Sequence, residues 1–196
     1  MGSRLEKQIG FLVEVDKMKN ILRQTILVDK SKRENDAEHS WHFALMAMIL
    51  FEYTNQKEVN ILRVLKMALV HDLIEIYAGD TFAYDEKGNE NKLERELVAA
   101  DKIFGLLPSD QGKELYDLWW EFEEAKTSDS KYAAAIDRLQ PFINNYMTEG
   151  HTWRMGNVTS DKVYKRMAMV KEGAPELWSL VVDIINSSIE KGYLQK

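Results

Sequence analysis

The sequence contains no cysteine among its 196 residues. This absence excludes a disulfide framework, a thiolate nucleophile and a zinc site built from cysteines. Histidines and carboxylates are therefore the only plausible metal ligands, and such ligands suit hard or borderline divalent cations. Proline and glycine are also scarce, at 3 and 10 residues, and the chain is 45% hydrophobic and 30% charged, the composition of an ordinary soluble globular protein.

Long hydrophobic runs are missing as well. No apolar segment approaches the length that spans a membrane, and the first residues do not form a signal-peptide pattern. Positive charge is in deficit, because the formal net charge is -6, whereas a general nucleic-acid-binding surface requires clustered lysine and arginine. We therefore expect a cytoplasmic protein that binds neither membranes nor nucleic acids, although one local pocket could still hold a small anion.

Helical periodicity is abundant. Apolar residues at three- and four-residue steps predict helices over residues 5–20, 37–53, 59–76, 90–104, 109–126, 130–147, 160–171 and 175–191. No convincing strand pattern, internal repeat or low-complexity segment is present, and 196 residues suffice for one sizeable core. The sequence thus predicts an all-α fold, a single helical bundle over residues 1–196, with its core at about 5–147 and the helices at 160–191 packed on it.

The predicted helix at 59–76 contains an unusual polar stretch. Its buried face is predicted to consist of Leu65, Ala68, Leu69, Leu73 and Ile76. His71 and Asp72 interrupt this apolar run, and Glu75 follows them at a spacing that places all three side chains toward one side of the helix. Burying such groups is unfavourable unless a partner compensates, and a metal ion is one such partner. The simpler alternative is a core histidine satisfied by a neighbouring carboxylate.

Two other predicted helices also place a potential ligand among apolar residues. His39 lies near the start of the helix at 37–53, and Asp137 lies within the small apolar residues of the helix at 130–147. With His71 and Asp72 they supply two imidazoles and two carboxylates, a coherent set for one divalent ion that keeps water in its open positions. Manganese, cobalt, iron, zinc and magnesium are all compatible with this set.

The order His, His-Asp, Asp on an all-α chain resembles the HD-domain metal-dependent phosphohydrolases. The resemblance covers about residues 5–147. It extends to the local strings Arg-Gln-Thr at 23–25, Ala-Glu-His-Ser at 37–40, His-Asp-x-x-Glu at 71–75 and Gly-Asp at 79–80, which look like the branch that contains bacterial 5′-deoxynucleotidases. It implies an HD-domain helical bundle that hydrolyses a nucleoside 5′-monophosphate, preferably a deoxy one, to nucleoside and phosphate.

Individual roles follow from this resemblance. It implies that the metal is held by His39, His71, Asp72 and Asp137. It also implies that Arg23 contacts the phosphate, Glu75 lies beside the attacking water, and Asp80 contacts the sugar. These roles agree with the chemistry, because a metal ion makes hydroxide available near neutral pH and arginine binds phosphate in a bidentate geometry. Some relatives have an aromatic residue after the arginine where this chain has Gln24 and Thr25, which leaves the base contacts open.

HD-domain proteins that catalyse other reactions have residues that this chain lacks. Two-metal HD proteins rely on extra histidines before the last aspartate, and none occurs between His71 and His151, so one metal is expected. Guanosine tetraphosphate hydrolases have an aspartate where this chain has Ile76, and a triphosphohydrolase would require more basic residues near the site. The alternatives are an HD-type nucleotide pyrophosphohydrolase or phosphodiesterase, a non-catalytic metal- or nucleotide-binding regulatory protein, and a structural metal site.

Several polar features have ordinary explanations. The charge run at 29–36 is expected to be a solvated loop, and its end can cap the helix that follows. His42 and His151 could assist the site, but a core or surface position is the simpler interpretation for each. Arg138 directly follows a proposed ligand, and such neighbours are more often ion-paired surface groups than catalysts.

Two apolar features bear on burial and assembly. Trp119 and Trp120 are adjacent, so at most one can face the core and the other could mark a subunit contact. Together with the resemblance, this pair predicts a homodimer. The first predicted helix is expected to bury Ile9, Leu12, Val13 and Met18.

Overall fold

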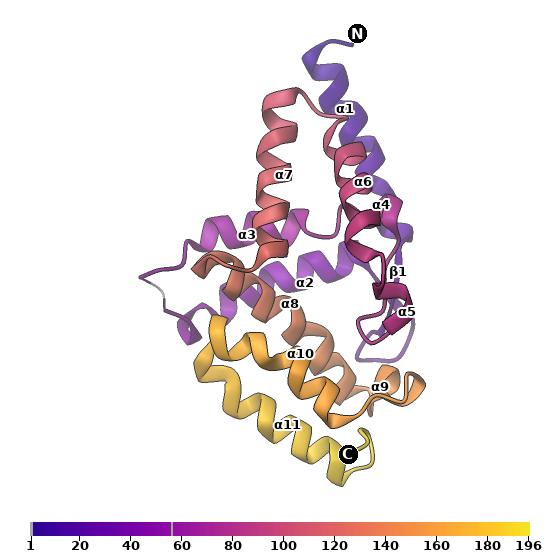
Figure 1. The fold of residues 1–196 in the computed structure, drawn as a ribbon, viewed down its shortest axis with the longest axis vertical. Coiled ribbons are helices and arrows are strands. Elements are labelled where there is room, and N and C mark those ends of the chain that lie inside the picture. The colour runs from indigo at the N-terminus through magenta and orange to yellow at the C-terminus, as the bar shows by residue number, and fades with distance from the viewer. Residues whose placement is uncertain (1, 56) are drawn as a thin grey trace.

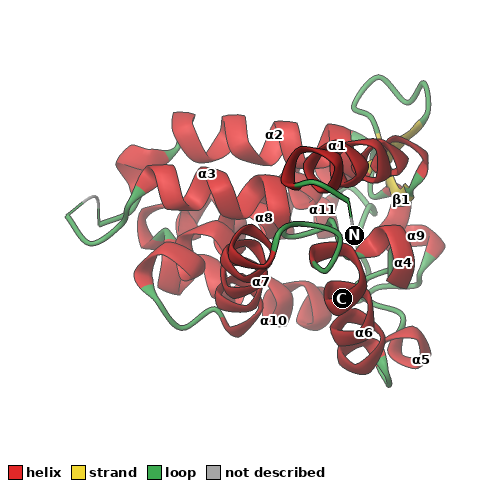
Figure 2. Ribbon diagram, turned by 90° about the horizontal axis from the view of Figure 1, so that it is seen from above, coloured by secondary structure: helices red, strands yellow, loops and turns green. Residues whose placement is uncertain are grey.

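The computed structural model describes residues 2–55 and 57–196. Its helices are α1 (Arg4–Val15), η1 (Asp16–Asn20), α2 (Asp36–Ile49), η2 (Phe51–Tyr53), α3 (Ile61–Val70), α4 (Glu75–Ala78), α5 (Glu86–Asn89), α6 (Lys92–Phe104), α7 (Ser109–Glu124), α8 (Ser128–Met147), α9 (His151–Met155), α10 (Ser160–Gly173), η3 (Pro175–Leu177) and α11 (Trp178–Glu190). A two-stranded antiparallel sheet joins β1 (Leu22–Ile26) to β2 (Arg33–Asn35). Figure 2 shows how little strand there is, and the predicted all-α class is confirmed.

Helix α8 lies at the centre of the fold. It packs against α2 and α3 on one side and against α10 on the other, and α11 lies along α10 (Figure 1). The sequence explains its position, because Tyr132–Ile136 is an unbroken run of buried residues and Leu139 and Phe142 extend it. A helix that is apolar on most of its circumference belongs in the interior. The polar residues of α8 that face inward are therefore the ones that require an explanation.

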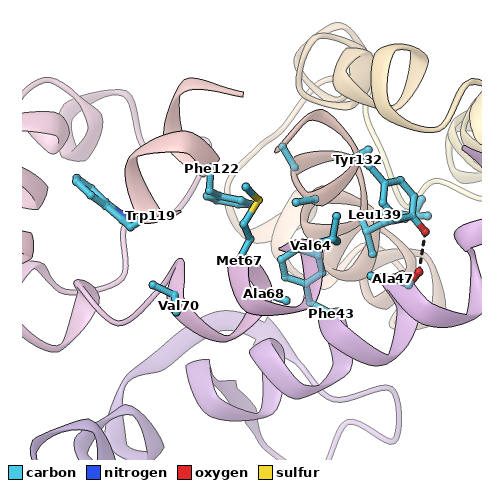
Figure 3. Close-up of a cluster of buried hydrophobic side chains, with 14 of the residues drawn as sticks. Phe43, Ala47, Val64, Met67, Ala68, Val70, Trp119, Phe122, Tyr132 and Leu139 are labelled. Carbon is cyan, nitrogen blue, oxygen red and sulfur yellow. Dashed lines mark hydrogen bonds between the residues drawn. The ribbon is translucent and has the colours of Figure 1, made fainter. Parts of the chain in front are cut away.

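A cluster of large buried side chains lies where α2, α3, α7 and α8 meet (Figure 3). Phe43, Met67 and Tyr132 are almost fully buried, and the Tyr132 hydroxyl donates a hydrogen bond of 2.8 Å to the carbonyl of Ala47. Burying each such side chain contributes about 1.5–3 kcal/mol. The ring of Phe122 lies 5.0 Å from the ring of His71, so the core continues directly into the polar stretch of residues 71–75.

The predicted helix at 59–76 is interrupted. Helix α3 ends at Val70, and residues 71–74 form a turn with i→i+3 hydrogen bonds before α4 begins at Glu75. The apolar periodicity could not detect this turn, because turn and helix share similar spacing over four residues. Leu69, predicted to be buried, is 58% exposed, and Val64 and Met67 are buried instead. Gly79 ends α4 with a φ of 77°, as a glycine after a helix readily does.

The β-hairpin was not predicted. Its strands are short, and the burial of β2 alternates through Glu34, a buried carboxylate, rather than through apolar residues. Period-two hydrophobicity is therefore missing although the pairing is present. The tip of the hairpin is solvated, with Lys30, Lys32 and Arg33 exposed, as expected for the charge run. Beyond it Asn35 caps α2 in a capping box with Glu38, which confirms the predicted helix start.

Helix α1 buries less than its sequence predicts. Phe11 is buried, and Met18 in η1 is buried as predicted. Ile9, Leu12 and Val13 are all more than half exposed, so that part of the prediction is wrong. The reason is that α1 lies at the periphery, beside α6 and α7, and buries only one edge (Figure 1).

In α7, Trp119 is fully buried and Trp120 half-buried, so only the first reaches the core completely. None of the described helices is long and apolar enough to cross a membrane.

Candidate metal centre and active site

Two imidazoles come to the site from neighbouring helices. His39 lies one turn into α2 and is fully buried, and His71 lies in the turn that ends α3. The Nδ1 of His71 is 3.0 Å from the carbonyl oxygen of Ala68. A carbonyl only accepts hydrogen bonds, so Nδ1 carries the proton and Nε2 is left free to bind a metal. The Nε2 of His71 is buried without a hydrogen-bond partner among the described residues.

Two carboxylates complete this group of four. The Oδ1 of Asp137, on α8, lies 3.0 Å from Nε2 of His39 and 3.6 Å from Nε2 of His71. The Oδ2 of Asp72 lies 3.1 Å from Nε2 of His71 and 3.8 Å from Nε2 of His39. Metal–ligand bonds of about 2.0–2.2 Å place neighbouring ligand atoms about 3 Å or slightly more apart. Each aspartate oxygen thus lies within 3.8 Å of both histidine nitrogens, and His39, His71 and Asp72 offer atoms within 4.8 Å of one another, while the role of the four residues as metal ligands stays a prediction.

The charges of this group depend on one another. Burial alone would lower the pKa of His71, but Asp72 and Asp137 raise it to about 10. Burial would raise the pKa of Asp72 and of Asp137, yet the adjacent histidines lower both pKa values below the ordinary range of aspartate. The two aspartates are therefore ionised, and His71 holds a proton that a divalent cation must displace. The two negative charges of the aspartates therefore favour a cation at this site.

Arg23 reaches the same site from β1. Its Nη1 lies 2.8 Å from Oδ2 of Asp72 and 3.5 Å from Oδ1 of Asp36, and its Nε is 3.8 Å from Oε2 of Glu34. Burial lowers the pKa of Arg23, but Asp72 and the other acids raise it more strongly, so the guanidinium stays charged. Its Nε makes no hydrogen bond to a described residue. Arg23 therefore has donor capacity left for an anionic ligand.

A second group of acids adjoins the first. Asp36, Glu75 and Asp80 can each place a carboxylate oxygen within 4.8 Å of the others. Burial, reinforced by Asp72, raises the pKa of Asp36 to about 7 and that of Glu75 well above its usual range. The sequence suggested only a helix cap for Asp36. An all-oxygen group of this kind can hold a hard cation, so the number of metal ions stays a prediction.

A buried glutamine connects the site to its surroundings. Gln140, one turn after Asp137 on α8, lies with Oε1 2.9 Å from Nδ1 of His39. Its amide nitrogen donates to Oε1 of Glu34 at 2.7 Å and lies 3.1 Å from Nδ1 of His42. Neither Gln140 nor Glu34 was predicted from the sequence. The i, i+3 spacing after Asp137 was the available signal, because a second polar residue on the same buried helix face is rarely accidental.

A cavity of about 120 Å³ opens onto these groups. Its wall includes Arg23, Asp72, Glu75, Asp80 and Asp137. Its aromatic lining is formed by Phe82, Tyr84, Phe122, Phe142 and Trp153. His151 is exposed and is not part of this lining, and His42 reaches the site only through Gln140. The cavity thus places a cation-binding centre, an arginine and aromatic surfaces around one small volume.

Comparison with known proteins defines the class. The profile of the HD domain family matches residues 15–178, so the chain belongs to the HD domain family. The chain is similar to curated 5′-deoxynucleotidases named HDDC2. It is 33% identical to the Homo sapiens protein over 143 residues, which cover 72% of this chain and 68% of that relative. It is 34% identical to the Mus musculus protein over 136 residues, which cover 69% of this chain and 66% of that relative. The matched segments thus span about two thirds of these relatives.

A solved structure extends the comparison to the whole chain. A protein described as a predicted metal-dependent phosphohydrolase, from Magnetospirillum magnetotacticum MS-1, superposes with a TM-score of 0.94 at 48% identity over 99% of this chain and 97% of that one. A conserved hypothetical protein from Pyrococcus furiosus shares the fold, with a TM-score of 0.60 at 21% identity over 93% of this chain and 99% of that one. The predicted HD-domain resemblance is confirmed.

Proposed function

We propose that this protein is a metal-dependent phosphohydrolase that cleaves nucleoside 5′-monophosphates, preferably deoxyribonucleotides, to nucleoside and phosphate. The curated relatives carry the name 5′-deoxynucleotidase, and the Magnetospirillum protein is described as a metal-dependent phosphohydrolase. The observation that carries the proposal is the convergence of His39, His71, Asp72 and Asp137, with the Arg23 guanidinium 2.8 Å from Asp72. Arg23, His71, Asp72 and Asp137 all line one cavity, which supports a metal site beside a phosphate-binding arginine.

We assign the metal to the four convergent residues, with Asp36, Glu75 and Asp80 as neighbouring acids outside this ligand set. When bound, a divalent ion supplies charge neutralisation and lowers the pKa of a coordinated water. His39 and His71 would bind through Nε2, because their Nδ1 atoms are held by Gln140 and the Ala68 carbonyl. The donor set of imidazole and carboxylate does not select one metal, so manganese, cobalt, iron, zinc and magnesium are all to be tested.

The chain's own residues would handle the phosphate and the protons. Arg23 would bind two phosphate oxygens and neutralise charge in the transition state. Glu75 has a raised pKa, so it can hold a proton near neutral pH and donate it to the 5′-oxygen of the departing nucleoside. Asp80 is half-buried beyond the end of α4, where its carboxylate can accept a hydrogen bond from a sugar hydroxyl.

An aromatic wall would receive the base. Phe82 and Tyr84 lie two and four residues after Asp80, their ring centroids are 5.4 Å apart, and both line the cavity. These rings can take the role of the aromatic residue that follows the arginine in some relatives and that is replaced here by Gln24. Stacking on aromatic side chains is tolerant of base identity, so we expect weak discrimination among the bases.

We also propose that the protein is a homodimer that associates through α2. Trp41, Leu45 and Met48 follow one another at steps of four and three, so they form one stripe on α2, and all three are exposed. An apolar groove beside the stripe is lined by Leu45 and Ile49 and by Ile143 of α8. Exposed apolar surface of this extent marks contact sites, and isologous dimers are the commonest assembly. The single domain over residues 1–196 and the cytoplasmic location stay predictions.

The proposed reaction is tested by a substrate panel. Phosphate release is measured with deoxyribo- and ribonucleoside 5′-monophosphates, the matching 3′-monophosphates, nucleoside triphosphates and guanosine tetraphosphate, each with added manganese, cobalt or magnesium. The proposal predicts release from the 5′-monophosphates and little from the 3′-isomers. Turnover confined to triphosphates or to guanosine tetraphosphate would replace it with the pyrophosphohydrolase alternative. Asp80→Asn should raise KM for the monophosphates more than it lowers kcat.

A further inference from the structure

A second cavity lies next to the first. It has a volume of about 590 Å³ and opens between the segment around α5 and the helices α8 and α10, which lie side by side in Figure 1. Its lining residues are Ala83, Tyr84, Glu86, Asn89, Glu90, Arg138, Lys162, Lys165 and Arg166. The second cavity is thus more than a crevice between side chains and is large enough for a polar group of a ligand.

The charge of the second cavity opposes that of the chain. Its wall contains two arginines and two lysines against two glutamates, in a protein whose formal net charge is -6. Lys162, Lys165 and Arg166 lie at steps of three and one, so they share one side of α10. Lys162 forms an ion pair of 2.8 Å with Glu86, but both side chains are largely exposed and the pair is correspondingly weak. The cavity therefore keeps a local excess of positive charge.

The two arginines are held together without a carboxylate between them. Nη1 of Arg138 donates to the backbone carbonyl of Arg166 at 3.4 Å, and both side chains are half-buried. Neither forms an ion pair with a carboxylate in the described part of the chain, so the sequence expectation of an ion-paired surface Arg138 is wrong. Two partly desolvated guanidinium groups are stable together when an anion joins them.

The second cavity is continuous with the active site. Ala83, Tyr84, Arg138 and Arg166 line both cavities. Arg138 directly follows the proposed ligand Asp137 on α8, and the chain runs from Asp80, the proposed sugar contact, to Tyr84 in four residues. A nucleotide with its 5′-phosphate at Arg23 and its sugar at Asp80 would therefore have the basic cavity beside its sugar.

We propose that Arg138 and Arg166, assisted by Lys165, form a subsite for a phosphate group other than the one that is hydrolysed. One source of this group is the substrate itself, which would then be a nucleotide with a second phosphate on its sugar, such as a nucleoside 3′,5′-bisphosphate. The other source is free inorganic phosphate, the product of the reaction. The first source rests on the proposed nucleotidase function, whereas phosphate binding by the subsite does not.

Binding is measured first, without catalysis. Inorganic phosphate and pyrophosphate are titrated into the metal-stripped full-length protein by isothermal titration calorimetry, with wild type and with Arg166→Gln, Arg138→Gln, Arg23→Gln and Lys171→Gln variants. Lys171→Gln is the matched control, because it removes one charge from α10 at a residue that lies over the ring of Trp178, outside the cavity. We expect Kd to rise at least tenfold in Arg166→Gln and Arg138→Gln and to change less than twofold in Lys171→Gln, whereas Arg23→Gln reports on phosphate held at the active site.

Three outcomes of the titration would overturn the subsite. They are no binding of either probe to wild type, binding that Arg166→Gln and Arg138→Gln both leave intact, and binding that Arg23→Gln alone abolishes. Circular dichroism and thermal unfolding of each variant establish that it is folded. Because the metal is absent throughout, these outcomes are independent of whether the protein hydrolyses nucleotides.

Kinetics then separate the two sources. With manganese added, kcat/KM is measured for adenosine 3′,5′-bisphosphate, which keeps a 2′-hydroxyl for Asp80, and for adenosine 5′-monophosphate. If the second phosphate belongs to the substrate, the bisphosphate is favoured at least tenfold in wild type, and Arg166→Gln reduces that ratio to about one. A ratio near one in wild type, with phosphate binding that depends on Arg166, assigns the subsite to free phosphate. If no nucleotide releases phosphate, the proposed function is wrong, and the titration still tests the subsite.

Discussion

The Nδ1 of His39 lies 2.9 Å from the side-chain oxygen of Gln140, and both residues are fully buried. Since an amide oxygen only accepts, Nδ1 carries the proton and Nε2 is directed at Asp137. The amide nitrogen of Gln140 in turn donates to Glu34. One glutamine thus fixes the tautomer and the orientation of a proposed metal ligand, as hydrogen-bond partners of metal-binding histidines commonly do.

Gln140→Leu should weaken metal binding without removing a ligand. The substitution keeps a similar volume but leaves His39 free to rotate or change tautomer, so we expect manganese affinity to fall by about 10–100-fold. Electron paramagnetic resonance of free Mn²⁺ measures the dissociation constant directly. Asn144→Leu is the matched control, because Asn144 is a buried amide four residues further along α8 whose side chain forms no hydrogen bond to a proposed ligand within the described part of the chain. Equal loss in both variants would point to a general packing defect instead.

Replacing Arg23 with lysine should impair activity as strongly as replacing it with glutamine. Lysine keeps the charge, but its single ammonium group cannot bind two phosphate oxygens in the bidentate geometry of a guanidinium. We expect kcat/KM to fall by about 10²-fold in both variants, with the larger part in KM. Steady-state kinetics with one deoxyribonucleoside 5′-monophosphate measures the effect. An Arg23→Lys enzyme within twofold of wild type would remove the bidentate role.

The metal-free protein should lose stability as the pH rises from about 6 to 9. His71 has a pKa of about 10 in the folded protein and 6.5 as a free side chain, so its stabilising contribution is complete below pH 6.5 and disappears as the pH passes through 10. Asp36, with a pKa raised from 3.8 to about 7, binds its proton more tightly when folded, so stability also falls as the pH rises from about 4 to 7. Thermal unfolding in a chelator at pH 6, 7.5 and 9 measures both effects.

Metal binding should show the opposite trend. A cation displaces the proton of His71, a proposed ligand whose pKa is raised to about 10, so its affinity rises with pH and binding releases protons. The increase in melting temperature caused by manganese is therefore expected to be larger at pH 8.5 than at pH 6. Calorimetry in buffers of different ionisation enthalpy counts the released protons. A binding enthalpy that is the same in every buffer would contradict the coupling.

Trp41→Glu should convert a dimer into a monomer. Trp41 is 65% exposed on α2, so the substitution leaves the core intact but introduces a charge into the proposed contact. Light scattering coupled to size-exclusion chromatography measures the mass of wild type and variant. Leu93→Glu, at an exposed apolar residue of α6, is the control that should leave the mass unchanged. A wild-type monomer at all concentrations would end the dimer proposal.

The sequence predicted the helical framework because most helices have clear apolar periodicity and strong ends. Asn35 with Glu38 set the start of α2, and Gly79 set the end of α4. The polar residues at 39, 71–72 and 137 were recognisable because each interrupts an apolar helix face. The structure brings these four side chains together, although their role as metal ligands stays a prediction.

Other features depend on tertiary contacts that periodicity does not encode. The turn at 71–74 is caused by local i→i+3 hydrogen bonds, and the hairpin pairs strands whose inward residue, Glu34, is charged. Gln140 was missed because its partners, Glu34 and His39, are about a hundred residues away in sequence. Leu69 was assigned to the wrong face because a helix with apolar residues on several sides does not reveal which side its neighbours cover.

The central claim is that His39, His71, Asp72 and Asp137 form one metal centre that makes the protein a phosphohydrolase. The most direct test is phosphate release from a deoxyribonucleoside 5′-monophosphate by metal-stripped protein, before and after manganese, cobalt or magnesium is added back, in wild type and in Asp72→Ala and Asp137→Ala. We expect no release without metal, release on addition, and a loss of at least 10³-fold in each variant. Release that is unaffected by chelation or by both substitutions would contradict the account.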